Sequence, residues 1–454
     1  MTTERLLTGT SPMQFLCLGI IGYLTYGIFR ALYNIYFHPL SSFPGPKLRA
    51  GFYFPFYYDR LTGDYINDWH ELHEKYGEVV RIAPHILSTI SPDAWRVAPD
   101  KDHTRMRRSI NHAFSEQALR SQENIITGYI TFMISKLHAR AQTQTPIDVT
   151  RWMNATTFDI TGDLAFGEPF GALEADACHS WIENTFAGLK WVRLMAPLRA
   201  YPIFGVPIFA LLRRWPALEQ ARKRQFGYLD EKLERRLRSK TDRNDFLRLT
   251  SGLLIIAGSE TSATCLSGAV YYLLKNPTWI TCLLSELRSA FKNESEMSFQ
   301  SLSHLKVLQA VIQESLRMYP PLPVDMPRMT PPEGATVCGA YIPPHTSISI
   351  PHYPAYHSHL NFKDPDTFAP ERWLGDEKYA DDRRSVLQPF SMGSRNCIGQ
   401  NLAWAEMRSI LARLVWSFEM ELLPESEGWD QGQKIYLLWF KPALMVRLRA
   451  REVE

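Results

Sequence analysis

The sequence predicts a mainly α-helical protein with a small β portion, preceded by one N-terminal transmembrane helix. Three observations support this fold class. Residues 6–29 carry no charge and are mostly apolar. Several later segments repeat apolar residues at the spacing of a helix. Short β-branched runs, interrupted by prolines, are concentrated at residues 323–370, which is typical of small strands and turns.

Size and composition indicate a folded protein of enzyme size. The chain has 454 residues, of which 45% are hydrophobic and 21% charged, and this excludes a largely disordered chain. Its length predicts two ordinary domains or one large unit. A net charge of +3 gives no support for nucleic-acid binding. The six cysteines include no CxxC pair, which excludes a disulfide scaffold or zinc finger by spacing.

The N-terminal stretch is long enough to span a membrane. Leu6–Phe29 exceeds the roughly 20 apolar residues that a spanning helix needs. A cleaved signal peptide is the alternative, but it requires a small-residue cleavage site, whereas Arg30 and aromatic residues follow here. We therefore expect residues 1–35 to be a membrane anchor and residues 36–454 to form the globular domain.

The charges around this span predict its orientation. Glu4 and Arg5 precede it, whereas Arg30, Lys47 and Arg49 follow it. Because cytoplasmic flanks carry the excess of Lys and Arg, the main body is expected on the cytosolic side of the membrane.

The elements of the main body are predicted from periodicity and from stop signals. A short strand is expected at Val79–Ile82, after the helix-stopping Gly77. The segment Ser251–Lys275 is long and apolar and ends before Asn276-Pro277, which predicts a buried central helix. Helices are predicted at Asp64–Tyr76, Asp102–Phe114, Gly227–Lys240, Ser251–Lys275 and Leu302–Met318, and from Cys397 onward.

The most informative stretch surrounds Cys397. This cysteine precedes a predicted long helix, whose N-terminal dipole favours a thiolate, and nearby glycines allow close approach of the backbone to a flat partner. A thiolate held in this way suits axial ligation of haem iron. The alternative is an inert cysteine in a glycine-containing turn. Phe390, Gly393, Arg395, Cys397 and Gly399 resemble the haem-binding signature FxxGxRxCxG of the cytochrome P450 family at every fixed position.

A second motif, Ala257-Gly258-Ser259-Glu260-Thr261, resembles the P450 oxygen-activation motif (A/G)Gx(D/E)T. The resemblance implies that Gly258 opens space over the haem, that Thr261 hydrogen-bonds dioxygen and that Glu260 delivers protons as a general acid. A glycine and an acid–alcohol pair in a buried helix cost stability unless they are used. The alternative is an incidental polar pair on a solvated face.

A third pattern resembles the ExxR triad of the family. Glu314 and Arg317 lie at i, i+3 on one helix face, where the ordinary meaning is a surface ion pair. Pro370-Glu-Arg372-Trp373 resembles the segment that completes the triad. The resemblance implies a structural role for these three charged side chains and no chemistry.

Basic residues resemble the family's haem-propionate contacts. His103 and Arg107 lie at i, i+4 on a predicted helix, and Arg328 follows the ExxR helix. The alternative is a solvated basic face. The segment Lys101–Arg108, with Arg408 and Arg413, is also expected to dock an acidic electron donor.

The resemblance extends from the anchor to the end of the chain and is strongest to membrane-bound fungal P450s of secondary metabolism, of the type that tailors trichothecenes. It implies haem b and a monooxygenase that inserts one oxygen atom from O₂ into a hydrophobic small molecule, a terpenoid or polyketide. No flavin or Rossmann fingerprint is present, so electrons are expected from NADPH-cytochrome P450 reductase, with cytochrome b5 as an optional second donor. The expected location is the endoplasmic reticulum membrane, single-pass, facing the cytosol.

Two segments depart from the family by being short, near residues 97–102 and 246–254. Both are expected on the substrate side of the haem. Two alternative functions therefore remain open. One is P450 chemistry without oxygen insertion, such as oxidative coupling or rearrangement, although the intact Glu260-Thr261 pair argues against it. The other is a catalytically inactive, truncated haem protein.

Overall fold

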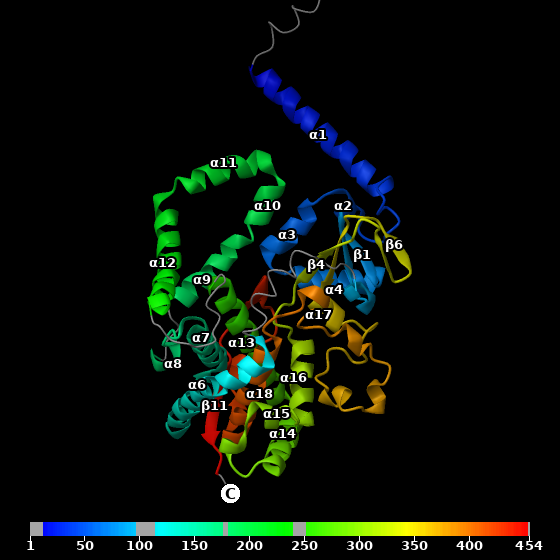
Figure 1. Cartoon of the computed structure of the whole chain (residues 1–454). Helices are drawn as coiled ribbons and strands as arrows, with labels where there is room; N and C mark the ends of the chain where they lie inside the picture. The colour runs from blue at the N-terminus through cyan, green and yellow to red at the C-terminus, as the bar shows by residue number, and fades with distance from the viewer. Residues whose placement is uncertain (1–11, 97–113, 176–179, 239–250, 453–454) are drawn as a thin grey trace, which may run out of the picture.

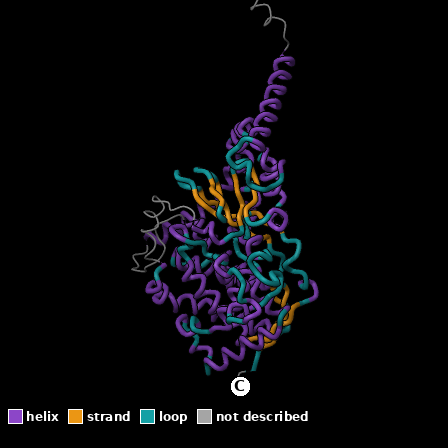
Figure 2. Tube along the Cα trace, turned by 90° about the vertical axis from the view of Figure 1, so that its right-hand side faces the viewer, coloured by secondary structure: helices purple, strands orange, loops and turns teal. Residues whose placement is uncertain are grey.

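The computed structural model describes residues 12–96, 114–175, 180–238 and 251–452. It consists mainly of helices with a small strand portion, as predicted. Helix α1 projects away from the body, and the C-terminus lies at the opposite end of the molecule (Figure 1). Most strands gather between α1 and the helical body (Figure 2).

The helices make up most of the body, and the longest are α6, α13, α12 and the projecting α1. Their bounds are α1 Pro12–Tyr36, α2 Lys47–Gly51, α3 Phe54–Thr62, α4 Tyr65–Tyr76, α6 Glu116–Gln142, α7 Val149–Phe166, α8 Ala172–Ala175, α9 Ser180–Val192, α10 Met195–Ala200, α11 Pro202–Arg213, α12 Pro216–Arg238, α13 Ser251–Lys275, α14 Pro277–Ala290, α15 Phe299–Leu302, α16 Lys306–Met318, α17 His352–Tyr356 and α18 Gln400–Ser417.

The strands form one four-stranded sheet, one three-stranded sheet and two small hairpins. The larger sheet has the order β1-β2-β7-β4, in which only the β2–β7 pair is parallel. The three-stranded sheet has the order β3-β11-β8, and the hairpins are β5-β6 and β10-β9. The strands are β1 Val79–Ala83, β2 Ile86–Thr89, β3 Ile147–Asp148, β4 Asp325–Met329, β5 Ala335–Val337, β6 Ala340–Ile342, β7 Ser347–Pro351, β8 Phe418–Leu422, β9 Lys434–Tyr436, β10 Leu438–Phe440 and β11 Met445–Ala450.

Helix α13 runs through the centre of the helical body, packed against α7, α16 and α18. Small residues make this close packing possible. A Cβ added at Gly258 would lie 3.3 Å from the Thr161 Cγ2 atom on α7, and one at Gly268 would lie 2.9 Å from the Tyr319 ring. The glycines of α13 thus lower its helix propensity but let neighbouring elements approach its backbone.

A buried charge cluster braces the body next to α16. Arg317 donates two hydrogen bonds to the Glu314 carboxylate, at 2.7 and 2.9 Å, and Arg372 reaches the same carboxylate at 3.3 Å. All three side chains are fully buried. Burial opposes ionisation of Glu314, but the two guanidinium groups prevail and lower its pKa. The geometry is that of a structural brace, because none of these three side chains lines the cavity beside Cys397.

Some predicted elements differ from the observed ones. The helix expected at Leu302–Met318 is two helices, because Leu305 takes an extended conformation and α16 begins only at Lys306. The carboxylate of Glu286 caps this new start by accepting the N–H groups of Val307 and Leu308. The helix predicted at Asp102–Phe114 lies almost entirely outside the described residues.

Candidate active site

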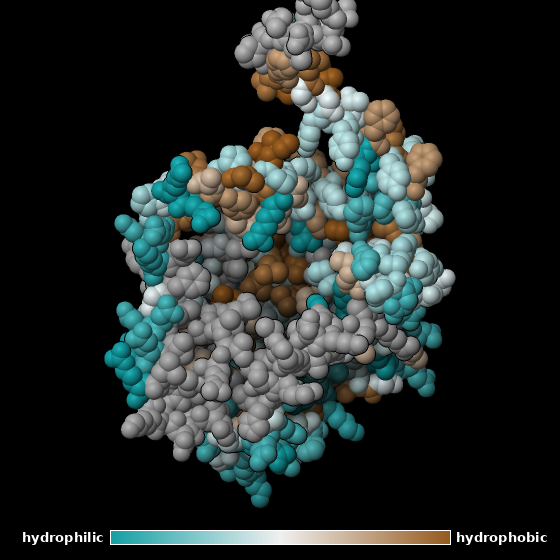
Figure 3. Space-filling view, turned by 45° about the horizontal axis from the view of Figure 1, so that its top comes forward, coloured by the Kyte–Doolittle hydropathy of each residue, from teal (hydrophilic) through white to brown (hydrophobic). Residues whose placement is uncertain are grey.

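A cavity of about 280 Å³ lies between α7, α13, α18 and the loop that carries Cys397. Most of the side chains around it are apolar, so the cavity favours an apolar occupant over water. Its apolar walls include Ala165, Leu254, Leu316, Leu322, Met326 and Leu402. Figure 3 shows a hollow floored by hydrophobic residues on the side of the molecule from which α1 rises.

The Cys397 loop holds its sulfur at the edge of this cavity. The N–H of Cys397 donates to the Phe390 carbonyl at 2.6 Å, which closes the loop. Gly393 takes a φ of +75°, the left-handed conformation that glycine adopts without strain. Helix α18 begins at Gln400, three residues after the cysteine, so its unpaired N–H groups and positive dipole end favour a thiolate.

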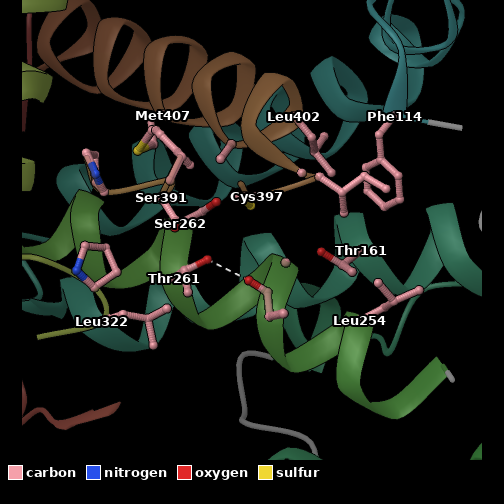
Figure 4. A pocket seen from close by; sticks show the side chains of 18 of the residues that line it. Phe114, Thr161, Leu254, Thr261, Ser262, Leu322, Ser391, Cys397, Leu402 and Met407 are labelled. Carbon is pink, nitrogen blue, oxygen red and sulfur yellow. Dashed lines mark hydrogen bonds between the residues drawn. The ribbon is translucent and has the colours of Figure 1, made fainter. Parts of the chain in front are cut away.

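Helix α13 forms the facing wall of the cavity (Figure 4). The hydroxyl of Thr261 points to this cavity and donates to the Ala257 carbonyl one turn earlier, at 2.6 Å. Gly258 also lines the cavity, but a side chain there would point at Thr161 on α7. Its absent side chain therefore serves the packing of α13 on α7 at least as much as it widens the cavity.

Glu260 lies on another face of α13, outside the cavity lining. Its carboxylate forms an ion pair with Lys441, and both side chains are almost fully buried, with 2% and 3% exposure. Lys441 also donates to the Thr264 hydroxyl at 2.6 Å. Because a buried charge is costly unless it is paired, this contact anchors the segment before β11 to the central helix. The role predicted for Glu260 as a proton donor stays a prediction.

Two guanidinium groups lie close together next to the cysteine loop. Arg328 donates to the Ser391 hydroxyl at 3.0 Å and to the Met392 carbonyl at 2.8 Å. Burial, and secondarily the charge of Arg395, lowers the pKa of Arg328. Two neighbouring cations of this kind favour an anionic group between them, and a carboxylate would relieve their repulsion.

These features fit a haem. In the described part of the chain, no group of three or more His, Cys, Asp or Glu side chains gathers that could hold a metal ion by itself. An apolar cavity that begins at the thiol suits a porphyrin, and the two arginines suit its propionates.

The structure brings most of the predicted site residues together. Arg328 and Gly393 belong to the immediate surroundings of the cysteine loop, and Glu260 lies apart. His103 and Arg107 lie outside the described residues. The predicted residues that line this cavity are Gly258, Thr261, Phe390, Arg395, Cys397 and Gly399.

Sequence reasoning overlooked two buried polar groups and misjudged a third. Ser262 lines the cavity and Glu406 lies fully buried on α18. The signal that would have revealed Glu406 is an acidic residue within the apolar stripe of a predicted helix. Arg413, predicted as part of a docking surface, is only 3% exposed and pairs with Glu294 and the Met297 carbonyl. It is therefore a structural residue and not a surface charge.

Comparison with known proteins agrees with this geometry. The family model described as cytochrome P450 matches residues 93–251 and 242–446. Cytochrome P450 monooxygenase astA of Talaromyces wortmannii is 40% identical, covering 94% of this chain and 96% of its own length. Cytochrome P450 monooxygenase aclL of Aspergillus oryzae is 40% identical, with 95% and 97% covered. Averantin hydroxylase of Dothistroma septosporum is 35% identical, with 99% and 94% covered.

The comparisons also bear on the length of the chain. The alignment with astA runs over 476 positions, more than the whole length of this chain, so the relative carries residues that this chain lacks. The two parts of the family match overlap at residues 242–251, close to the segment near 246–254 that is predicted to be short. The family match covers well over half of the chain, and the relatives are enzymes of fungal secondary metabolism. The chain therefore belongs to the cytochrome P450 family of haem-thiolate oxidoreductases.

Proposed function

We propose that the protein is a haem b monooxygenase that inserts one oxygen atom from O₂ into a hydrophobic small molecule of fungal secondary metabolism. The observation that carries this proposal is the apolar cavity with Cys397 in one wall and Thr261 in the facing helix. The name averantin hydroxylase, carried by one relative, supports oxygen insertion as the reaction type. A terpenoid or a polyketide is the substrate class that we predict.

Cys397 would hold the haem through its thiolate, and Arg328 and Arg395 would hold the propionates. When bound, the haem supplies the binding and activation of O₂. Leu254, Leu322 and their apolar neighbours exclude water and orient the substrate by contact, because they offer it no polar partner.

Thr261 is the alcohol that we assign to proton transfer at the cavity. Its hydroxyl donates to the Ala257 carbonyl, and both oxygen lone pairs remain able to accept a hydrogen bond. Rotation about the Cβ–Oγ1 bond would redirect this proton from the helix to a ligand in the cavity. Glu260, one residue earlier, is held by Lys441 and would have to leave that ion pair to act as the proton source.

Electrons would come from NADPH-cytochrome P450 reductase, with cytochrome b5 as an optional second donor. Of Arg408 and Arg413, both predicted to dock this partner, Arg408 is the less buried, being partly exposed. It stacks on Trp404 at 4.8 Å from the ring centroid and donates to Gln309. The segment Lys101–Arg108 lies outside the described residues.

We place the protein in the endoplasmic reticulum membrane as a single-pass protein that faces the cytosol. The apolar helix Met13–Tyr36 is long enough to cross a membrane, and its side chains are largely exposed. Arg30 near the C-terminal end of this helix, and Lys47 and Arg49 after it, support the orientation. Helix α11 also supports association with a membrane, because it exposes several apolar side chains. Those that are more than half exposed are Ile203, Phe204, Val206 and Leu211.

The reduced CO-difference spectrum of the expressed chain tests the haem-thiolate assignment. We expect the thiolate-type Soret band in the wild type and its loss in Cys397→Ser, because a serine oxygen is a harder and weaker ligand. Cys282→Ser, at an exposed cysteine on α14, is the matched control and should keep the band. An unchanged band in Cys397→Ser would overturn the assignment.

Turnover with purified reductase tests the reaction type. Incorporation of one ¹⁸O atom from ¹⁸O₂ into the product identifies a monooxygenase, whereas a rearranged or coupled product without ¹⁸O identifies the alternative P450 chemistry. A normal CO spectrum with no product from any apolar substrate identifies an inactive haem protein.

A further inference from the structure

Glu406 on α18 is a fully buried carboxyl group that the proposed reaction does not use. Neither of its carboxylate oxygens has a hydrogen-bond partner among the described residues. Burial raises the pKa of Glu406 to about 8, and the nearby Ser262 hydroxyl only partly opposes this. Such a pKa favours the neutral carboxylic acid at neutral pH, and this form can donate a hydrogen bond.

Glu406 differs from the other buried acids of the body. Glu260 has Lys441 as its counter-ion, and Glu314 has Arg317 and Arg372. In the part of the chain that the structure describes, no charged side chain from any neighbouring element affects the pKa of Glu406, on which only burial and the Ser262 hydroxyl act. It therefore does not act as an ion-pair brace.

Ser262 is the polar neighbour of Glu406, and it is also exceptional on its own helix. Within residues 259–267, all of which the structure describes, Ser262 is the one hydroxyl-bearing residue without a hydrogen-bond partner. The other four hydroxyl groups donate to a protein oxygen: Ser259 to Thr157, Thr261 to Ala257, Thr264 to Glu260 and Ser267 to Ala263.

The position of Ser262 connects Glu406 to the cavity. Ser262 is 2% exposed and lines the cavity directly after Thr261, while Met407, the residue after Glu406, lines it from α18. Figure 4 shows Ser262 between α13 and the helix that carries Leu402 and Met407. The Ser262 hydroxyl lies near enough to the Glu406 carboxyl to lower its pKa, although neither group has a hydrogen-bond partner among the residues that the structure describes.

We propose that Glu406 is a positioning residue that donates its carboxyl proton as a hydrogen bond to the Ser262 oxygen and so directs the Ser262 hydroxyl proton into the cavity. A serine hydroxyl has one proton and two acceptor sites, so an oxygen that accepts from Glu406 keeps its own proton for a ligand. The cavity then offers a second alcohol donor beside Thr261 to an oxygen-bearing ligand at the haem. Ionised Glu406 would instead accept from Ser262, and this donor would be withdrawn from the cavity.

Infrared difference spectra of the haem-loaded protein test the pair itself. We expect the C=O stretch of a protonated carboxylic acid at neutral pH, its absence in Glu406→Gln, and a frequency shift in Ser262→Ala, which removes the hydrogen-bond acceptor. Ser267→Ala is the matched control, because Ser267 is buried on the same helix and bonded to its own backbone. A carboxylic-acid band that persists in Glu406→Gln, or that is unmoved in Ser262→Ala, would overturn the pairing.

The C–O stretch of the CO-bound, reduced protein tests the donor, because it responds to hydrogen-bond donors around the ligand. We expect the wild-type stretch to change between about pH 6.5 and about pH 9, as Glu406 ionises. Glu406→Gln keeps a donor at every pH and should hold the low-pH frequency throughout. Ser262→Ala and Glu406→Leu should show the high-pH frequency at every pH.

The inference rests on a haem bound at Cys397, and the same samples separate the two ideas. Absence of the thiolate-type Soret band from the wild-type protein would overturn the proposed function. A normal Soret band with a C–O stretch that is independent of pH, or equally pH-dependent in Ser262→Ala, would overturn the role of Glu406 alone. Glu406→Leu, which removes the buried acid, guards against loss of folding in a single variant.

Discussion

At the scale of single residues, Thr261 is the side chain whose removal best separates oxygen activation from haem binding. Thr261→Ala deletes the hydroxyl on the cavity wall and its bond to the Ala257 carbonyl. Losing one hydrogen bond in a rate-limiting protonation costs about 1.5–3 kcal/mol, on the order of a tenfold to hundredfold drop in product. We expect the haem spectrum and NADPH consumption to change far less, with peroxide released instead.

Product and peroxide formed per NADPH are the quantities to measure. Thr156→Ala is the matched control, because the Thr156 hydroxyl also donates to its own helix, on α7, but Thr156 does not line the cavity. Equal coupling in Thr261→Ala and wild type would show that Thr261 is not the alcohol used.

A second residue-scale prediction concerns the buried ion pair of Lys441 and Glu260. Lys441→Met leaves a carboxylate that is 2% exposed without its counter-ion, which typically costs 3–5 kcal/mol. We expect a lower Tm of the haem-loaded protein at neutral pH and partial recovery in the double variant with Glu260→Gln. Lys434→Met, which breaks an exposed pair with Asp64, is the control and should cost about 0–1 kcal/mol. Equal effects of the two lysine substitutions would contradict a buried pair.

At the scale of secondary-structure elements, the Glu314–Arg317–Arg372 cluster joins α16 to the 3₁₀ turn Pro370–Trp373. Besides the two arginines, the Ala369 N–H and the Trp373 indole N–H donate to the Glu314 carboxylate, at 2.9 and 2.8 Å. Five N–H groups from these four residues donate to one buried carboxylate. A change in the charge of Glu314 therefore affects both elements together.

A lower pH should therefore destabilise the contact between α16 and the 3₁₀ turn. The arginines lower the pKa of Glu314 below its unfolded value, so its stabilising effect is complete above the unfolded pKa and is lost as the pH falls through the folded pKa. We expect Arg372→Leu to cost about 3–5 kcal/mol at neutral pH and to lose haem faster. Arg383→Leu, at an exposed ion pair with Glu78, is the control. The rate of decay of the Soret band is the measurement, and equal rates would argue against a brace.

At the scale of the whole molecule, two apolar regions suit a membrane. Helix α1 stands away from the body, and α11 presents Phe204 and Leu211, which are 62% and 69% exposed. Deleting Met1–Arg30 should move most of the protein from the membrane to the soluble fraction without loss of the haem spectrum, because α1 contributes no residue to the cavity.

We further expect the protein that remains on membranes to fall when Phe204→Ser and Leu211→Ser are added to the deletion. Leu374→Ser, at a hydrophobic residue exposed on another segment, is the control. Fractionation and haem content are measured together. A deletion that abolishes haem binding, or that leaves the whole protein on membranes, would contradict the assignment of α1 as a separable anchor.

Much of the fold was predictable because it depends on local properties of the chain. The bounds of α13 match the prediction, since an apolar run that ends at Asn-Pro contains its own stop signal. The Leu302–Met318 prediction was wrong at its start, because Glu286 of α14 caps the chain at Val307 and Leu308. No periodicity within that segment reveals a cap supplied by another helix.

The sequence by itself determined the family, the cysteine loop and the acid–alcohol motif, because each depends on residues close together in the chain. Only the tertiary structure decided that Glu260 pairs with Lys441, 181 residues away, and that Glu406 lies beside Ser262. The physical reason is that a buried polar group takes its partner from whatever element packs against it. Packing of distant elements is determined by the whole hydrophobic core, whereas helix periods and turn signals report only on their own segment.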